Sequence, residues 1–426
     1  MTTREENELM CHTGPGTPGG NMMRRYWLPI GLTEELPQGG APQPVMILSE
    51  KLVLFRDEQG RVGLLQRACP HRCTDLSYAR IEDGGLRCLY HGWLFDVAGN
   101  CMEQPGEPPE STYKDEVKAR SYPVIEKGGM IFTYLGKDTP PEFPAWEFLE
   151  APEAHRFHLR TQIHCNYMQA IEGNIDPVHL SYLHRPIKRV DNRPVPGSTK
   201  SADAFYAEER RPVLDLEQTD YGIRIFSVRN ADDDMQYLRV TNFIMPCLAA
   251  IVGNEGRVNE GYAVHWHVPI DDHNNMRFDF IYNRVKPLDK DKYRNRIGNV
   301  TGPDGVTRRS ADNRYFQSRD AMVNDNFTGM GGSFNVHDAF ATESMGPITD
   351  RTEEHLATSD RIIVRARRQI LEAIEDVADG KEPRGVIRDP AKRDRSHVVV
   401  VSEVIPRGLD PKEYWKSRVQ KSQAAQ

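Results

Sequence analysis

Two short stretches, each holding one cysteine and one histidine, constrain this chain more than any other feature. One residue separates Cys69 from His71, two residues separate Cys88 from His91, and sixteen lie between His71 and Cys88. Thiolates and imidazoles both bind transition metals. Because each stretch supplies one ligand of each kind, the fold has to bring two loops together around one metal centre.

Three chemistries fit cysteines and histidines at this density. In a Rieske [2Fe–2S] centre, two cysteines hold one iron and two histidines hold the other, which suits a mixed pair in each loop. A zinc site is the alternative, but zinc motifs usually pair like ligands, and C-x-H is an awkward bite on one tetrahedral ion. A redox pair of Cys69 and Cys73 leaves Cys88 and both histidines unexplained. We therefore favour the Rieske centre and assign Cys73 no ligand role.

Length and charge set the broad class. A chain of 426 residues can form two or three domains. The net charge of −7 argues against a nucleic-acid partner. Apolar runs fall short of the roughly 18 residues of a membrane span, and the first residues lack a signal-peptide pattern. We expect a cytoplasmic protein without a membrane anchor.

The pattern of apolar residues predicts an α+β chain. Short apolar runs between residues 43 and 137, split by turns such as Asp57–Gly60, predict an all-β domain. The proline-rich segment 137–144 marks a boundary. We expect an N-terminal segment over residues 1–42 that packs on the catalytic domain, a β domain over 43–140 and a catalytic domain over 141–426.

The catalytic domain is predicted to hold one antiparallel sheet and one long helix. Four segments alternate as strands do, at residues 221–229, 237–245, 261–270 and 276–285. A helical repeat of apolar residues follows Asp360 and stops at Gly380. The polar stretches 185–204 and 286–332 read as long loops.

A second group of metal-binding residues lies in the sequence EGNIDPVHLSYLH. Asp176, His179 and His184 have the D-x2-H-x4-H spacing, and two imidazoles with one carboxylate bind the iron of non-haem oxygenases. Because an i, i+5 step turns about 140° on a helix, His184 should lie beyond the last helical turn. Four other acids remain as the third ligand: Asp338, Glu343, Asp350 and Asp360. We expect Asp350 to form a surface pair with Arg351, and Asp360 to begin a helix.

These motifs resemble the Rieske non-haem iron aromatic-ring oxygenases. CPH…CLYHGWLFD is similar to their Rieske domain, and NYMQAIEGNIDPVHLSYLH to their catalytic segment. HDAFATESMGPI resembles the phthalate-dioxygenase branch, which favours Asp338 as the third ligand, with His337 in place of the usual glutamine. Cys73 stands where glycine is common, and Tyr167 where tryptophan is common.

The resemblance implies fold, cofactors and partners. It implies a helix-grip catalytic domain, a [2Fe–2S] cluster and a mononuclear Fe(II). Cys69, His71, Cys88 and His91 would bind the cluster, and His179, His184 and Asp338 the iron. Asp176 would link the iron to the Rieske histidine of a neighbouring subunit in a homotrimer or stacked trimers. A separate NAD(P)H-dependent reductase would supply electrons, and O₂ and an aromatic substrate would react.

The substrate and the reaction outcome remain open at this point. Dihydroxylation or monooxygenation of an aromatic carboxylate is our main reading, with O- or N-demethylation as the alternative. A carboxylate would need an arginine, and Arg224 and Arg239 lie on predicted strands. Four apolar residues, Phe243, Met245, Trp266 and Phe280, could line a pocket, but most are expected in the core. Alternatives of another class are a non-catalytic Rieske electron carrier and a zinc-stabilised ligand-binding protein.

Overall fold

The computed structural model describes residues 2–188, 194–232, 234–253, 260–298 and 307–424. The chain divides into two compact units, which we describe separately: a β unit, Thr13–Pro141, and an α+β unit made of Met1–His12 and Glu142–Gln426. The predicted N-terminal segment 1–42 is thus divided after residue 12. The reason is that its strand β1, Trp27–Leu32, pairs with β10, Met130–Tyr134, of the β unit.

The β unit consists of three small antiparallel sheets, with strand orders β1-β10-β9, β2-β3-β4 and β5-β6-β7-β8. Its other elements are α2 Pro18–Met23, β2 Gln43–Ile47, β3 Glu50–Arg56, β4 Val62–Gln66, β5 Arg80–Glu82, β6 Gly85–Arg87, β7 Leu94–Phe95, β8 Cys101–Glu103 and β9 Val124–Lys127. The expected turn at Asp57–Gly60 joins β3 to β4, and the buried Asp57 carboxylate accepts the backbone N–H groups of Gln59 and Arg61. The predicted all-β domain is confirmed.

The α+β unit is built on an eight-stranded antiparallel sheet. Seven strands follow the order β11-β17-β16-β15-β14-β13-β12, and the eighth, β18, pairs with β14. The strands are β11 Arg156–Ile163, β12 Val213–Gln218, β13 Gly222–Asn230, β14 Met235–Ile244, β15 Leu248–Ile251, β16 Ala263–Pro269, β17 Asn275–Tyr282 and β18 Val401–Pro406. All four predicted strands belong to this sheet, as β13, β14, β16 and β17.

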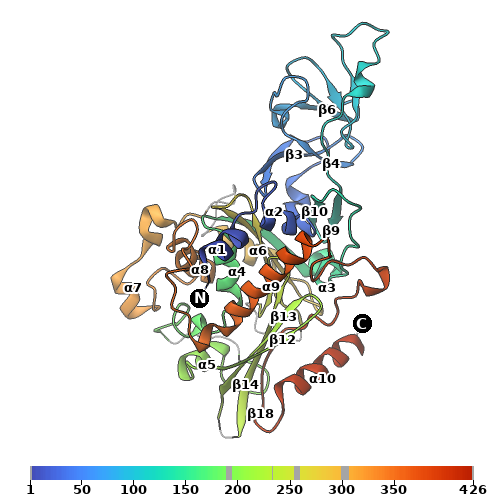
Figure 1. Ribbon diagram of the computed structural model, residues 1–426. Helices are drawn as coiled ribbons and strands as arrows, with labels where there is room; N and C mark the ends of the chain where they lie inside the picture. Colours follow the sequence, from blue (N-terminus) through green and yellow to red (C-terminus); the bar gives the residue numbers. More distant parts are fainter. Residues whose placement is uncertain (1, 189–193, 233, 254–259, 299–306, 425–426) are drawn as a thin grey trace. The chain divides into compact units, whose positions relative to one another are not determined.

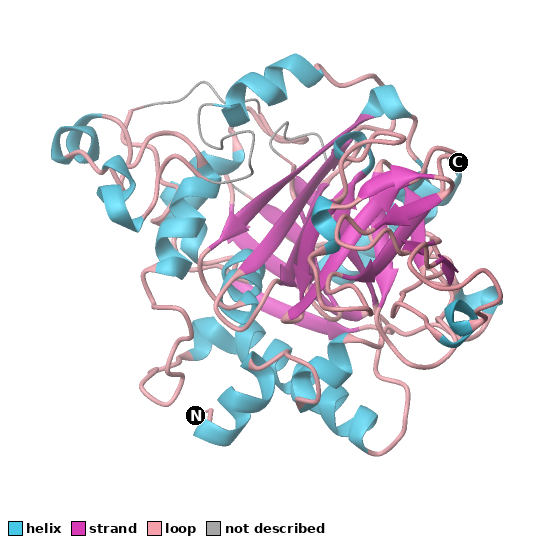
Figure 2. Cartoon of the chain, turned by 90° about the horizontal axis from the view of Figure 1, so that it is seen from above, coloured by secondary structure: helices cyan, strands magenta, loops and turns pink. Residues whose placement is uncertain are grey.

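Helices lie along both sides of these long strands (Figures 1 and 2). The helices of this unit are α1 Arg4–Cys11, α3 Glu147–Glu150, α4 Tyr167–Ile175, α5 Ala202–Glu208, α6 Lys290–Gly298, α7 Arg319–Asn324, α8 Phe334–Glu343, α9 Arg361–Ala378 and α10 Pro411–Ala424. The predicted long helix is confirmed as α9. The stretches expected to be loops contain α6, α7 and the start of α5, and their residues 189–193 and 299–306 lie outside the described residues. Within the described ranges, no helix is both long and apolar enough to span a bilayer.

The alternation of side chains gives the sheet two distinct faces. On one face, Trp415 of α10 packs with Phe226 and Leu238, and Phe148 of α3 packs against Trp266 and Phe280. We call this the outer face. The opposite face contacts α4 through β14, β15 and β16, and we call it the inner face. Phe243 and Met245 are buried as well, so all four apolar residues considered for a pocket are buried, with Trp266 and Phe280 on the face away from α4.

Candidate metal centres

The two loops with cysteine and histidine have the same backbone construction. The amide of Cys73 donates to the carbonyl of Cys69 at 2.8 Å, and the amide of Gly92 donates to the carbonyl of Cys88 at 3.0 Å. Both closing residues adopt positive φ, 59° at Cys73 and 75° at Gly92. Since a left-handed backbone disfavours a Cβ atom, this geometry explains why glycine is the expected residue where this chain has Cys73.

The four side chains separate by type. Cys69 and Cys88 are buried among apolar residues of the β unit, whereas His71 is half-buried and His91 exposed. The two imidazole rings lie with centroids 4.5 Å apart, and Trp93 stacks on His71 at 4.3 Å. This separation of two thiols from two imidazoles suits a Rieske cluster, in which thiolates hold one iron and imidazoles hold the other.

The surroundings of Cys69 fit an iron–sulfur ligand. Burial, with a further contribution from the neighbouring Cys88, raises the pKa of the Cys69 thiol to about 12. The backbone N–H groups of His71 and Arg72 point at the same sulfur and favour its thiolate. A buried sulfur supplied with N–H donors is stable as a thiolate when a metal holds it there.

The second group of ligands lies where α4 ends. The helix stops at Ile175, Asp176 is its C-cap, and Pro177 follows. His179 begins a short 3-10 helix, His179–Ser181, and His184 lies beyond it, as the spacing predicted. Because the helix ends before His179, both imidazoles can point toward one position, which a continuous helix would prevent.

Asp338, on α8, completes this group. Its Oδ1 lies 3.0 Å from His184 Nε2 and 3.9 Å from His179 Nε2. Ligand atoms of these three residues all lie within 4.8 Å of one another, and within the described ranges no other set of three such residues does. Two imidazoles and one carboxylate on one side of an ion are the facial arrangement of non-haem iron sites.

A polar group lies beside the outer nitrogen of each imidazole. At His184 it forms a hydrogen bond, whereas His179 Nδ1 has an ion-pair contact but no hydrogen-bond partner among the described residues. Asp176 Oδ2 lies 3.5 Å from His179 Nδ1 and accepts the backbone N–H of the same residue at 3.2 Å. His184 Nδ1 lies 3.2 Å from Nδ1 of His337, whose Nε2 lies 2.7 Å from the carbonyl of Gly331. Since a carbonyl only accepts, His337 donates from Nε2 and accepts a hydrogen bond from His184 Nδ1–H at its own Nδ1, so His184 Nε2 is the nitrogen that can bind a metal.

The charges at this centre are those that a cation needs. Burial alone would raise the pKa of Asp338, but His184, by charge and hydrogen bond, and then His179 hold it well below its usual range. Burial lowers the pKa of His337 to about 4, which keeps this partner neutral. An ionised carboxylate and two imidazoles, which give up their protons when the metal binds, are a donor set that Fe(II) accepts.

The other acids considered for the third ligand are engaged elsewhere. Glu343 accepts the Tyr315 hydroxyl and the backbone N–H of His164. Asp350 is exposed and accepts from Thr352, and Asp360 precedes α9, as expected. The expected surface pair of Asp350 with Arg351 is wrong, because Arg351 is fully buried and binds Glu172 instead.

The two arginines proposed for substrate binding lie on opposite faces of the sheet. Arg224 lies on the outer face, where it pairs with Glu217 and stacks on Trp415 with its guanidinium carbon 3.2 Å from the ring centre. Arg239 pairs in register with Ser227 of β13. Ser227 is three residues after Arg224 and therefore on the opposite face of the sheet, so Arg239 lies on the inner face. Its charge acts on His179, which places it near the second centre.

A further polar group on the inner face was not predicted from the sequence. His265 and His267 of β16 both contact the side-chain amide of Asn174 on α4, at 2.6 and 3.1 Å. His265 also lies 3.1 Å from Asp279, which pairs with Arg277, and the Arg277 charge acts on Asp338. The two histidines are two positions apart on a predicted strand and therefore share one face of the sheet, and this spacing is the signal that could have identified them.

Together, the two ligand sets define an oxygenase subunit that combines a Rieske cluster with a mononuclear iron. Residues 26–123 match the Rieske [2Fe-2S] domain family, and residues 133–426 match the family described as LigXa C-terminal domain like. The oxygenase subunit of phthalate 4,5-dioxygenase from Pseudomonas putida is 36% identical, over 97% of this chain and 95% of its own length. The 5,5'-dehydrodivanillate O-demethylase oxygenase subunit of a Sphingobium species is 33% identical, over 92% of this chain and 85% of its own.

Solved structures agree on the fold. Dicamba monooxygenase bound to dicamba superposes with a TM-score of 0.60 at 20% identity, over 84% of this chain and 99% of its own. The oxygenase of carbazole 1,9a-dioxygenase in complex with ferredoxin gives 0.55 at 19% identity, over 92% and 97%. This chain belongs to the Rieske non-haem iron oxygenases, in the branch of phthalate 4,5-dioxygenase.

Proposed function

We propose that this chain is the oxygenase component of a system that hydroxylates an aromatic carboxylate with O₂. Cys69, His71, Cys88 and His91 would hold the [2Fe–2S] cluster, and His179, His184 and Asp338 the mononuclear Fe(II). The observation that carries the proposal is the convergence of these three ligands within 4.8 Å in a chain that also has a Rieske domain. When bound, the cluster would supply electrons and the iron would supply O₂ reduction and insertion.

The chain's own residues orient these groups. Asp176 faces Nδ1 of His179 and would also meet a cluster histidine of a neighbouring subunit, so that one carboxylate serves both centres. Such a link requires an oligomer, and we propose a trimer or stacked trimers in the cytoplasm, with a ferredoxin or NAD(P)H-dependent reductase as donor. Co-assembly of a Cys88→Ser subunit with a His179→Ala subunit should restore turnover if each cluster serves the next subunit's iron. Mixed oligomers without turnover would contradict this.

Arg239 supports an anionic substrate. It is 7% exposed, it lies on the inner face, and its Nε has no hydrogen-bond partner among the described residues. Arg277 has an equally unpartnered Nη2 there. Burying guanidinium N–H groups without partners is costly, and Arg224 on the outer face has an unpartnered Nε too. Because Arg239 and Arg277 are the two that lie on the inner face with the iron ligands, we propose that a substrate carboxylate accepts their N–H groups. Phthalate and 3-chlorobenzoate, in the names of two relatives, are such anions.

The experiment compares Arg239→Gln with Arg224→Gln. A hydrogen bond to a charged group contributes about 1.5–3 kcal/mol, so Arg239→Gln should lower kcat/KM for an aromatic carboxylate by roughly 10- to 150-fold. The neutral amide of the same compound should be affected much less, and Arg224→Gln, on the outer face, should behave as wild type. Equal losses for acid and amide would refute the carboxylate assignment.

Two further measurements separate the remaining alternatives. Purified protein should be brown-red, with a Rieske EPR signal after reduction, and a colourless zinc-loaded protein would contradict the cluster assignment. A methoxylated aromatic acid that releases formaldehyde would show O-demethylation, the reaction named for the Sphingobium relative. Hydroxylation without formaldehyde supports the main proposal.

A further inference from the structure

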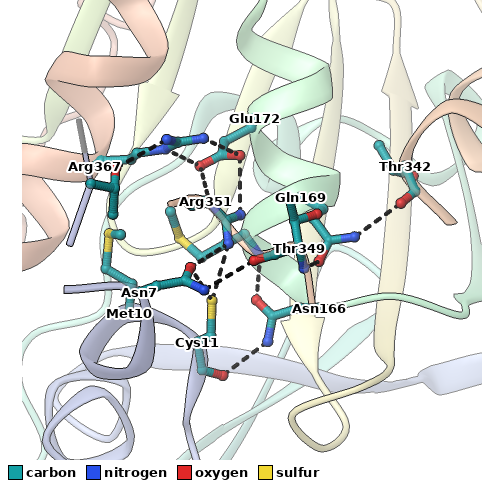
Figure 3. A network of polar contacts seen from close by, with 12 residues as sticks. Asn7, Met10, Cys11, Asn166, Gln169, Glu172, Thr342, Thr349, Arg351 and Arg367 are labelled. Atoms are coloured by element: carbon teal, nitrogen blue, oxygen red, sulfur yellow. Dashed lines mark hydrogen bonds and ion pairs between the residues drawn. The ribbon is translucent and has the colours of Figure 1, made fainter. Parts of the chain in front are cut away.

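Glu172, one turn before the end of α4, has a carboxylate that is enclosed by two arginines from distant parts of the chain (Figure 3). Arg367 of α9 binds it with Nε at 2.7 Å and Nη2 at 3.1 Å. Arg351 binds it with Nη2 at 3.1 Å and Nε at 3.3 Å. Both contacts use two nitrogens, which fixes the direction of the carboxylate as well as its distance.

The group is closed and balanced in charge. Arg367 also binds Glu354, at 2.5 and 3.0 Å, so that two positive charges meet two negative ones. Burial opposes ionisation of Glu172, but the charges of Arg351 and Arg367 keep its pKa below the ordinary value. We call Glu172, Glu354, Arg351 and Arg367 the Glu172 cluster.

The N-terminal helix α1 covers one side of this cluster. Arg351 Nη1 donates to Asn7 Oδ1 at 2.9 Å and to Cys11 Sγ at 3.2 Å. The carbonyl of Cys11 in turn accepts from Asn166, the N-cap of α4, at 2.9 Å. A segment that precedes the whole β unit in sequence therefore completes a polar group at the centre of the α+β unit.

Polar side chains fasten α4 on its other sides as well. Gln169 binds the carbonyls of Thr342 and Gly346, at the end of α8, the helix that carries Asp338. Asn174 points to β16, and two residues turn a helix by about 200°, so it holds the side opposite Glu172. The last turn of α4 is thus held between the sheet and α9.

This last turn leads directly into the iron ligands. The carbonyl of Glu172 accepts the backbone N–H of Asp176 at 3.2 Å, and Asp176 accepts the backbone N–H of His179. A shift of the Glu172 carboxylate moves the start of this chain of hydrogen bonds. A displacement of only tenths of an ångström at His179 matters for a metal ligand, because iron bonds to imidazole nitrogen tolerate little change in length.

We propose that the Glu172 cluster is a positioning device for the mononuclear iron site, acting through α4 on Asp176 and His179. The proposal rests on the assignment of His179, His184 and Asp338 as iron ligands. A stabilising role alone explains the cluster poorly, because apolar side chains of similar volume are often as stable as a buried ion group or more so. The two arginines instead fix the rotation of α4 about its axis and its position along that axis.

The experiment measures binding of Co(II) to protein that keeps its [2Fe–2S] cluster but has been freed of mononuclear metal. Glu172→Gln should bind Co(II) 10- to 100-fold more weakly than wild type, the range typical for loss of a residue that orients a metal ligand. The visible spectrum of the [2Fe–2S] cluster, in the β unit, should stay unchanged. Unaltered Co(II) affinity in Glu172→Gln would overturn the proposal.

Glu147→Gln provides a matched control. Glu147 lies on α3 in the same unit, is largely buried, and binds both Arg284, at 2.7 Å, and Tyr282, at 2.9 Å. Its loss should reduce thermal stability as the loss of Glu172 does. Because α3 packs on the outer face, Co(II) affinity should not change. An equal loss of affinity in both variants would show a general effect of stability and overturn the proposal.

The double variant Glu172→Gln/Arg351→Gln separates positioning from stability. It restores charge balance, with Arg367 left facing Glu354, so most of the lost stability should return while Co(II) affinity stays low. Recovery of both together would overturn the proposal, and the double variant serves as the test if the single one does not fold. His179→Ala should abolish Co(II) binding; if it does not, the ligand assignment fails rather than the role of the cluster.

Discussion

His337 offers the most direct test of how the iron site is organised. Its ring connects His184 Nδ1, at 3.2 Å, to the carbonyl of Gly331, at 2.7 Å. His337→Leu keeps a side chain of similar size but removes both contacts. His337→Gln retains an oxygen that can accept from His184 and an amide that can donate to Gly331, and glutamine is the residue expected here from the family resemblance.

The structure sets the size of the effect. His337 is 2% exposed and His184 6%, so water cannot replace the lost partner. A buried donor left unpaired costs about 1–3 kcal/mol. Without metal, the His184 ring can turn to recover a partner, and the cost then appears when metal binding forces the ring back. His337→Leu should therefore weaken metal binding by roughly 5- to 150-fold.

The assay is Co(II) titration of cluster-loaded protein, with iron content after anaerobic reconstitution as a second readout. His337→Gln should bind Co(II) with an affinity close to that of wild type, and His337→Leu should bind it much more weakly. The Rieske spectrum should be the same in all three proteins. Wild-type affinity in His337→Leu would refute the tautomer argument. Equal losses in both variants would show that ring volume, rather than hydrogen bonding, is what His184 requires.

Two further outcomes follow from the backbone and the buried charges. Cys73→Gly should stabilise the β unit by up to about 1 kcal/mol, because relief of left-handed backbone strain, about 1–2 kcal/mol, exceeds the cost of glycine's added flexibility in the unfolded chain, about 0.4–1 kcal/mol. Cys73→Ala keeps the Cβ and should show no gain. Denaturant unfolding followed by cluster absorbance measures both variants. The folded pKa of Glu172 lies below its ordinary value of 4.5, so its carboxylate stabilises the fold above that pH and loses this contribution as pH falls through the folded pKa. The difference in unfolding free energy between wild type and Glu172→Gln should then be constant near neutral pH and shrink below about pH 4.5; a difference that persists in acid would contradict the ion pairing.

Local sequence patterns were enough to propose the cysteine and histidine ligands and to predict four of the eight strands of the sheet, whereas Asp338 was chosen from four acids by the family resemblance. Candidate ligands within one loop can be recognised by their spacing in the sequence. Pro177 likewise indicates that the helix ends before His179, as the convergence of His179 and His184 requires. Alternation found four strands because each has a buried side. The same alternation could not say which face holds Arg224 and which holds Arg239, because this depends on the register between β13 and β14.

What the sequence concealed is the pairing of residues far apart along the chain. Arg351 reads as a surface residue beside Asp350, since arginine is rarely buried, yet its partners are Glu172, Asn7 and Cys11. The division of the N-terminal segment after residue 12 has the same origin. No local pattern shows that α1 belongs to the α+β unit, whose other residues come after the β unit in the sequence, while β1 belongs to the β unit.

The composition of α4 shows how much of this protein is arranged around one short segment. A buried helix is usually apolar, because each buried polar group costs free energy unless it is paired. Gln169, Glu172 and Asn174 are each paired, and each to a different neighbour: the end of α8, α9 and β16. Apolar packing tolerates small sliding and rotation, whereas three directional contacts on three sides leave α4 one position. Asp176 and His179 follow that helix directly, so the precision the iron site requires is supplied by residues that do not touch the metal.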